Sequence, residues 1–63
     1  MDKKDMKYQV GDLVELNSEW NNQLGLIIDI DDADKDNVVY LVDINGEPSP
    51  GWLSFYPIRR KIN

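Results

Sequence analysis

The chain has no cysteine and no histidine among its 63 residues. Without cysteine no disulfide can form, and without both residue types the usual zinc ligand sets are missing. The three serines, Ser18, Ser49 and Ser54, have no base beside them, and no glycine-rich phosphate loop is present. We therefore expect a protein that is not an enzyme and needs no cofactor.

Long apolar runs are also missing. The longest extends from Leu24 to Ile28, whereas a membrane helix needs about 20 apolar residues. The lysines near the N-terminus are not followed by the apolar stretch of a signal peptide. These features predict no membrane association and a cytoplasmic location.

Positive charge is scarce in the middle of the chain. The net charge is −5, but residues 12–47 carry ten carboxylates and one lysine, a local balance of −9. Such a segment repels a phosphate backbone, which nucleic-acid-binding proteins neutralise with lysine and arginine. The charge distribution predicts a protein partner of basic character and disfavours nucleic acid.

Turn residues separate five short runs of apolar, β-branched and aromatic residues, and no helical period is visible. The expected strands are residues 13–16, 24–30, 38–44, 52–56 and 58–62. Strands at this spacing are typical of a small barrel or sandwich. We predict an all-β domain, a single five-stranded barrel over residues 8–63, preceded by a flexible tail of residues 1–7.

Alternation along these strands predicts which side chains enter the core. In the second strand we expect Leu24, Leu26, Ile28 and Ile30 to share one face. The predicted core residues are Val10, Val14, Leu16, Leu26, Ile28, Ile30, Tyr40, Val42, Leu53, Phe55 and Ile58.

Two stretches, Val10–Leu16 and Leu24–Ile30, resemble the KOW-type opening of SH3-like barrels, in which a Gly-Asp-x-Val strand precedes a Gly-x-Ile strand. The segment Tyr40–Gly46, with Trp52 and Ile58–Ile62, resembles the second half of small barrel proteins encoded by tailed bacteriophages. The resemblance implies an SH3-like barrel. It also implies an accessory protein that binds a host or virion protein in the host cytoplasm.

Alternation also predicts that Trp52 and Tyr56 point outward, because Leu53 and Phe55 are expected to point inward. Trp20 lies in a polar loop, and Tyr8 precedes the first strand, which in a small barrel commonly neighbours the last. We expect Trp20, Trp52, Tyr56 and Tyr8 to form an exposed aromatic patch with Glu19 and Glu47 at its rim. Such a patch suits a partner with cations or apolar anchors.

Two alternatives use other residues or surfaces. A nucleic-acid or ribosome-associated KOW-like module would use Arg59, Arg60 and Lys61, and a structural subunit of a larger assembly would pair its sheet edges with neighbours.

The acidic segment after the second strand offers a candidate metal loop. The spacing of Asp32, Asp34, Asp36 and Asp43 matches positions 1, 3, 5 and 12 of a calcium loop. The segment is flanked by expected strands and not by helices, which favours the alternative of a solvated acidic hairpin.

Overall fold

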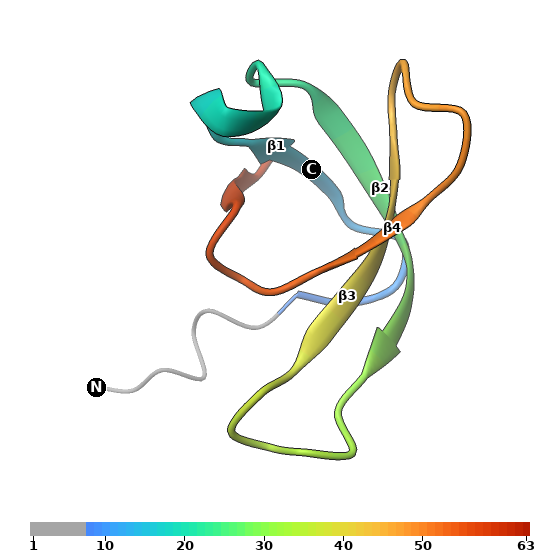
Figure 1. The fold of residues 1–63 in the computed structure, drawn as a ribbon, viewed down its shortest axis with the longest axis vertical. Helices are drawn as coiled ribbons and strands as arrows, with labels where there is room; N and C mark the ends of the chain where they lie inside the picture. The colour runs from blue at the N-terminus through green and yellow to red at the C-terminus, as the bar shows by residue number, and fades with distance from the viewer. Residues whose placement is uncertain (1–7) are drawn as a thin grey trace.

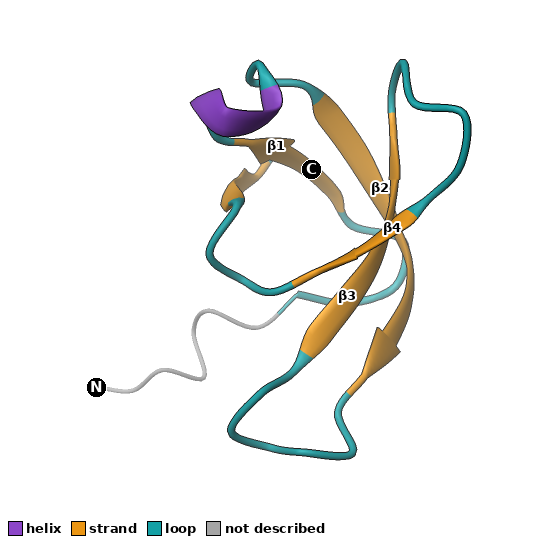
Figure 2. Cartoon of the chain, viewed as in Figure 1, coloured by secondary structure: helices purple, strands orange, loops and turns teal. Residues whose placement is uncertain are grey.

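The computed structural model describes residues 8–63, and the predicted tail of residues 1–7 lies outside them. Figures 1 and 2 show a sheet of short strands joined by loops, with one turn of 3₁₀ helix. The elements are β1 (Leu13–Leu16), η2 (Ser18–Trp20), β2 (Leu24–Asp31), β3 (Val39–Ile44), β4 (Gly51–Leu53) and β5 (Ile58–Lys61). The predicted all-β class is confirmed.

The five strands form one antiparallel sheet in the order β4-β3-β2-β1-β5. The first strand pairs with the last, as expected for a small barrel. Within residues 8–63, β4 and β5 are the two edges, so the sheet does not close on itself.

Two predicted segments differ from the structure. The loop after β1 contains η2, because the Asn17 side chain accepts a hydrogen bond from the Glu19 amide at 3.1 Å. The predicted fourth strand ends early, at Leu53. Beyond it the Ser54 hydroxyl accepts from the Tyr56 amide, and the Ile58 amide donates to the carbonyl of Phe55. These bonds form a tight turn before β5.

Strand β2 contains a β-bulge that decides which of its side chains enter the core. Ile27 pairs with Val42, but the next register pair is Asp29 with Leu41, so Ile28 and Asp29 together face one residue of β3. An extra residue of this kind interrupts the alternation of a strand and increases its twist. In a regular strand, residues three positions apart point to opposite faces. Because of the bulge, Ile27 and Ile30 both point inward.

The prediction that Leu26 and Ile28 belong to the core is wrong, although they do share a face with Leu24 as expected. Each of them is 40% exposed, whereas Ile27 is completely buried. The predicted face was displaced by one residue, and such a slip moves every side chain to the opposite side of the sheet. Ile30 was assigned correctly, because it lies beyond the bulge and packs against the core.

The core lies on the concave side of the sheet and draws on all five strands. Its buried members are Val14, Leu16, Ile27, Tyr40, Val42, Ile44, Leu53 and Ile58. Two other predicted members, Val10 and Phe55, are 60% and 52% exposed. Both lie in turns, where the alternation of a strand does not apply.

Gly25 faces inward on β2 and allows β3 to approach closely. A Cβ atom added at this position would collide with Cγ1 of Val42, a completely buried and stiff side chain. The same addition at Gly51, on the edge strand β4, would meet no atom within 4 Å. Gly25 therefore sets the spacing between β2 and β3 at the centre of the core.

We predict that Gly25→Ala lowers the free energy of unfolding by about 1–3 kcal/mol, the usual range for overpacking a core. The matched variant Gly51→Ala should change it by less than about 1 kcal/mol. Urea denaturation followed by tryptophan fluorescence measures both. Equal losses for the two variants would contradict the close packing of Gly25 on Val42.

Candidate functional site

The outer face of the sheet, opposite the core, carries exposed apolar side chains on adjacent strands. Leu24, Leu26 and Ile28 are each 40% exposed, and Trp52 is 51% exposed. Register places Leu13 opposite Leu26 and Leu41 opposite Trp52, and directly opposite residues share one face of a sheet. We call this surface the outer stripe; it comprises Leu13, Leu24, Leu26, Ile28, Leu41 and Trp52.

The outer stripe extends across four adjacent strands, β1 to β4. Single exposed apolar residues are normal on protein surfaces, but a contiguous apolar patch is typical of an interaction site. Trp52 adds a large, rigid aromatic side chain of the kind that dominates binding energy at interfaces.

Carboxylates share the outer face with the stripe. Asp43 lies opposite Leu26, Asp29 opposite Leu41, and Glu15 opposite Leu24. Glu15 is ion-paired with Arg60, whereas neither aspartate is ion-paired within residues 8–63. Among the described residues, the apolar stripe is therefore bordered by two aspartates that have no ion-pair partner.

The aromatic residues predicted to form one patch lie on two sides of the sheet. Trp52 and Tyr56 are exposed, at 51% and 71%. Tyr8 packs edge-to-face on Tyr40, with ring centroids 5.6 Å apart, and so lies on the core side. Trp20 also packs against the core. The structure therefore does not bring Tyr8 or Trp20 to Trp52.

The two acidic residues predicted for the rim lie outside the strands. Glu19 is part of η2, and Glu47 is in the turn between β3 and β4. The acids that share a face with Trp52 are instead Asp29, Asp43 and Glu15, as the strand register requires.

The basic residues of β5 are partly neutralised by neighbouring carboxylates. Arg60 Nε lies 2.7 Å from a carboxylate oxygen of Glu15, and Lys61 Nζ lies 3.6 Å from one of Asp12. Arg59 is exposed at the position of a second bulge, between the pairs Leu16–Ile58 and Glu15–Arg60. This arrangement leaves little free positive charge for a phosphate backbone.

The aspartates of the candidate calcium loop do not converge. Within residues 8–63, no group of three or more acidic side chains is placed to hold a metal ion. Asp34 accepts a hydrogen bond from the Asp36 amide at 3.0 Å. Asp43 lies in β3 on the outer face, away from the loop that contains Asp32. The segment 32–38 is an acidic loop between two strands.

In the part of the chain that the structure describes, two side chains have displaced pKa values. The pKa of Glu15 lies below its ordinary value, mainly because its carboxylate accepts a hydrogen bond from Arg60. Burial, with smaller contributions from Tyr40 and Asp12, raises the pKa of Tyr8.

Comparison of the chain with protein-family models, with curated proteins and with solved structures gave no match. Within residues 8–63 there is no helix with the length and apolar character needed to cross a bilayer.

Sequence reasoning missed most of the outer stripe, because it placed Leu26 and Ile28 in the core and assigned Leu24 to the same face. One signal could have identified the inward face of β2. Gly25 shares that face with Ile27, and a glycine inside a strand often marks a close approach of another backbone.

We predict that the Glu15–Arg60 pair adds stability that depends on pH. Because the pKa of Glu15 is lowered in the folded protein, its contribution is present above the ordinary value of about 4.5 and is lost as the pH falls through the folded value. The difference in unfolding free energy between wild type and Glu15→Gln should therefore shrink between about pH 7 and about pH 3. Arg60 is exposed, so we expect a small effect.

Denaturant titrations at several pH values measure this difference, with Glu19→Gln as a control for a general loss of negative charge. A difference that stays constant with pH for Glu15→Gln would contradict the pairing.

Proposed function

We propose that this chain is a non-enzymatic protein-interaction domain that binds a protein partner across the outer stripe. The observation that carries the proposal is the exposure of Leu24, Leu26, Ile28 and Trp52 on a single face of the sheet. Eight apolar side chains are buried in the core of this small domain, yet these four remain in contact with water. Covering them with a complementary surface is favourable, at about 25 cal/mol for each Å² of apolar area buried.

The fold that we propose is an SH3-like barrel with a KOW-type opening, of the kind encoded by tailed bacteriophages. Three features support it. The segment Val10–Leu16, which resembles the KOW-type opening, includes the whole of β1. The first strand, β1, pairs with the last, β5. The bulges in β2 and β5 provide the local bending that a curled sheet needs.

The partner is expected to present an apolar surface flanked by lysine or arginine. Asp29 and Asp43 share the outer face with the stripe, and the net charge of the whole chain is −5. Charges arranged in this way attract basic partners and repel acidic ones. A second copy of the chain would bring a further charge of −5 to the surface, which disfavours self-association as the use of this face.

Nucleic acid is a weaker candidate for the ligand. Two of the three basic residues at the C-terminal end, Arg60 and Lys61, already lie beside carboxylates. A phosphate would have to displace Glu15 and Asp12 before it could pair with them.

Selection from a library of random linear peptides tests the proposal. We expect the retained peptides to combine aromatic or aliphatic residues with lysine or arginine. Their affinity should fall by about tenfold in Leu26→Gln and in Trp52→Ser, as is usual when one anchor contact is removed. Both side chains are exposed, so the variants should remain folded, which circular dichroism would verify.

Tyr56→Ser is the matched control, because Tyr56 is an aromatic residue that is more exposed than Trp52 but lies outside the strands. Its affinity for the peptides should be unchanged. If Tyr56→Ser abolishes binding while Leu26→Gln does not, the outer stripe is not the interface. Retention of acidic peptides would contradict the expected partner chemistry.

A further inference from the structure

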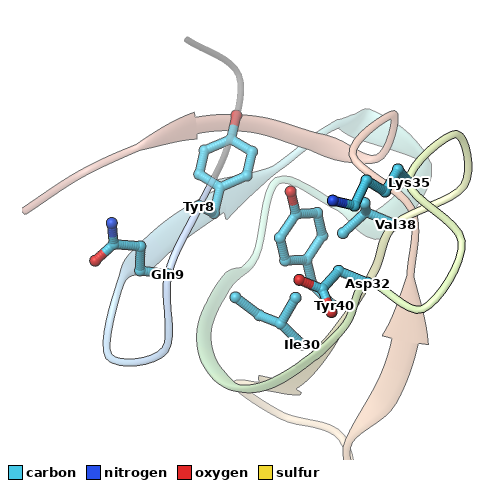
Figure 3. A pocket seen from close by; sticks show the side chains of 7 residues that line it. All are labelled: Tyr8, Gln9, Ile30, Asp32, Lys35, Val38 and Tyr40. Carbon is cyan, nitrogen blue, oxygen red and sulfur yellow. The ribbon is translucent and has the colours of Figure 1, made fainter. Parts of the chain in front are cut away.

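A hollow of about 380 Å³ opens on the core side of the sheet (Figure 3). The residues that line it are Tyr8, Gln9, Ile30, Asp32, Lys35, Val38 and Tyr40. Ile30 and Tyr40 project from β2 and β3, whereas Asp32 and Lys35 belong to the acidic loop between these strands. Figure 3 shows the two tyrosine rings near each other, with the Asp32 carboxylate and the Lys35 amine on the side of the loop.

The two tyrosines form a fixed aromatic wall. Their planes are inclined by 79° and their centroids lie 5.6 Å apart. Tyr40 is only 4% exposed, so a ligand in the hollow reaches chiefly the half-buried ring of Tyr8, which packs against Tyr40. The faces of aromatic rings carry partial negative charge and attract cations, more strongly when the site is shielded from water.

Asp32 supplies a carboxylate that is available at this wall. Asp31, at the end of β2, and the acidic loop that follows it together hold four aspartates and one lysine. Asp31 and Asp34 accept hydrogen bonds from backbone amides of the loop, at 3.1 and 3.0 Å. Asp32 makes no hydrogen bond or ion pair within residues 8–63 and lines the hollow. Its charge therefore adds to the attraction of the rings for a cation.

Lys35 lines the same hollow with an ammonium group of its own. A bound cation would be repelled by this group, and Lys35 would also compete for the Asp32 carboxylate. The lysine side chain is long and exposed, so it can turn away at a modest cost.

We infer that this hollow binds the cationic head of an organic ligand, an alkylammonium or guanidinium group, against the Tyr8 ring, which Tyr40 supports, with Asp32 as its counter-ion. Apolar contact with Ile30 and Val38 would hold the methylene groups next to the charge. The inference does not rest on the outer stripe, because Tyr40 and Leu41 point to opposite faces of β3.

NMR titration of the full chain tests this site. The cationic probes are N-acetyl-arginine methylamide and N-acetyl-lysine methylamide, and the neutral probe N-acetyl-citrulline methylamide has nearly the shape of the first. We expect millimolar binding of the cationic probes, with shifts in the ring signals of Tyr8 and Tyr40, and much weaker binding of the citrulline compound. Butylammonium, which lacks the backbone amides of the lysine probe, distinguishes the source of the ligand. If it binds as tightly as the lysine probe, the ligand is a free amine. If it binds more weakly, the ligand is a side chain of a peptide.

Variants of the acidic loop identify the counter-ion. Asp32→Asn should weaken binding about fivefold, the usual scale for a partly exposed charge pair. Asp36→Asn removes the same charge from the same loop without touching the hollow, so it should have a clearly smaller effect. Lys35→Gln should strengthen binding.

Three outcomes would overturn the inference. These are equal binding of the citrulline and arginine probes, equal losses for Asp32→Asn and Asp36→Asn, and ring signals that do not respond to any cationic probe. Backbone amide spectra of each variant verify that the fold is retained.

Discussion

The bulge in β2 holds Ile27 and Ile30 on the same side of a strand in which simple alternation would separate them. Because of the extra residue opposite Leu41, one continuous apolar segment supplies side chains both to the outer face and to the core side of the sheet. Before the bulge, Ile27 enters the core between β1 and β3, and Leu24 and Leu26 remain on the outer face, as does Ile28 within the bulge. After it, Ile30 turns inward to form part of the hollow beside Tyr40. The outer stripe and the hollow both depend on this one irregularity.

The outer stripe and the hollow lie on opposite faces of one sheet, and acidic side chains lie beside both. Asp29 and Asp43 accompany the apolar stripe, and Asp32 accompanies the hollow. The only ion pairs within residues 8–63 join β5 to Glu15 of β1 and to Asp12, which precedes β1. Arg60 and Lys61 thus pair with carboxylates beside the edge strand. The three aspartates have no ion-pair partner within residues 8–63 and are available to a basic ligand. A single acidic domain could therefore contact a basic protein in two ways, through apolar area and through a cationic side chain.

The strands could be located from the sequence, but the faces of β2 could not be assigned. Turn residues such as Asn45 and Gly46 delimit the strands, and β1 was predicted with its observed bounds. The segment Leu24–Ile28 is apolar on both sides, so its alternation fits either orientation. A bulge depends on pairing with β3, which lies more than ten residues further along the chain, and local patterning does not report it. The partial burial of Tyr8 was missed for a similar reason, since it packs on Tyr40, which is distant in sequence; Trp20 is also partly buried against the core.

The orientation of β2 is the central claim, and the free energies of unfolding of Ile27→Ala and Ile28→Ala test it most directly. These adjacent variants delete the same atoms from the same strand. Because Ile27 is completely buried and Ile28 is 40% exposed, Ile27→Ala should cost about 2–5 kcal/mol and Ile28→Ala about 1 kcal/mol or less. A larger loss for Ile28→Ala than for Ile27→Ala would contradict the bulge, the outer stripe and the account built on them.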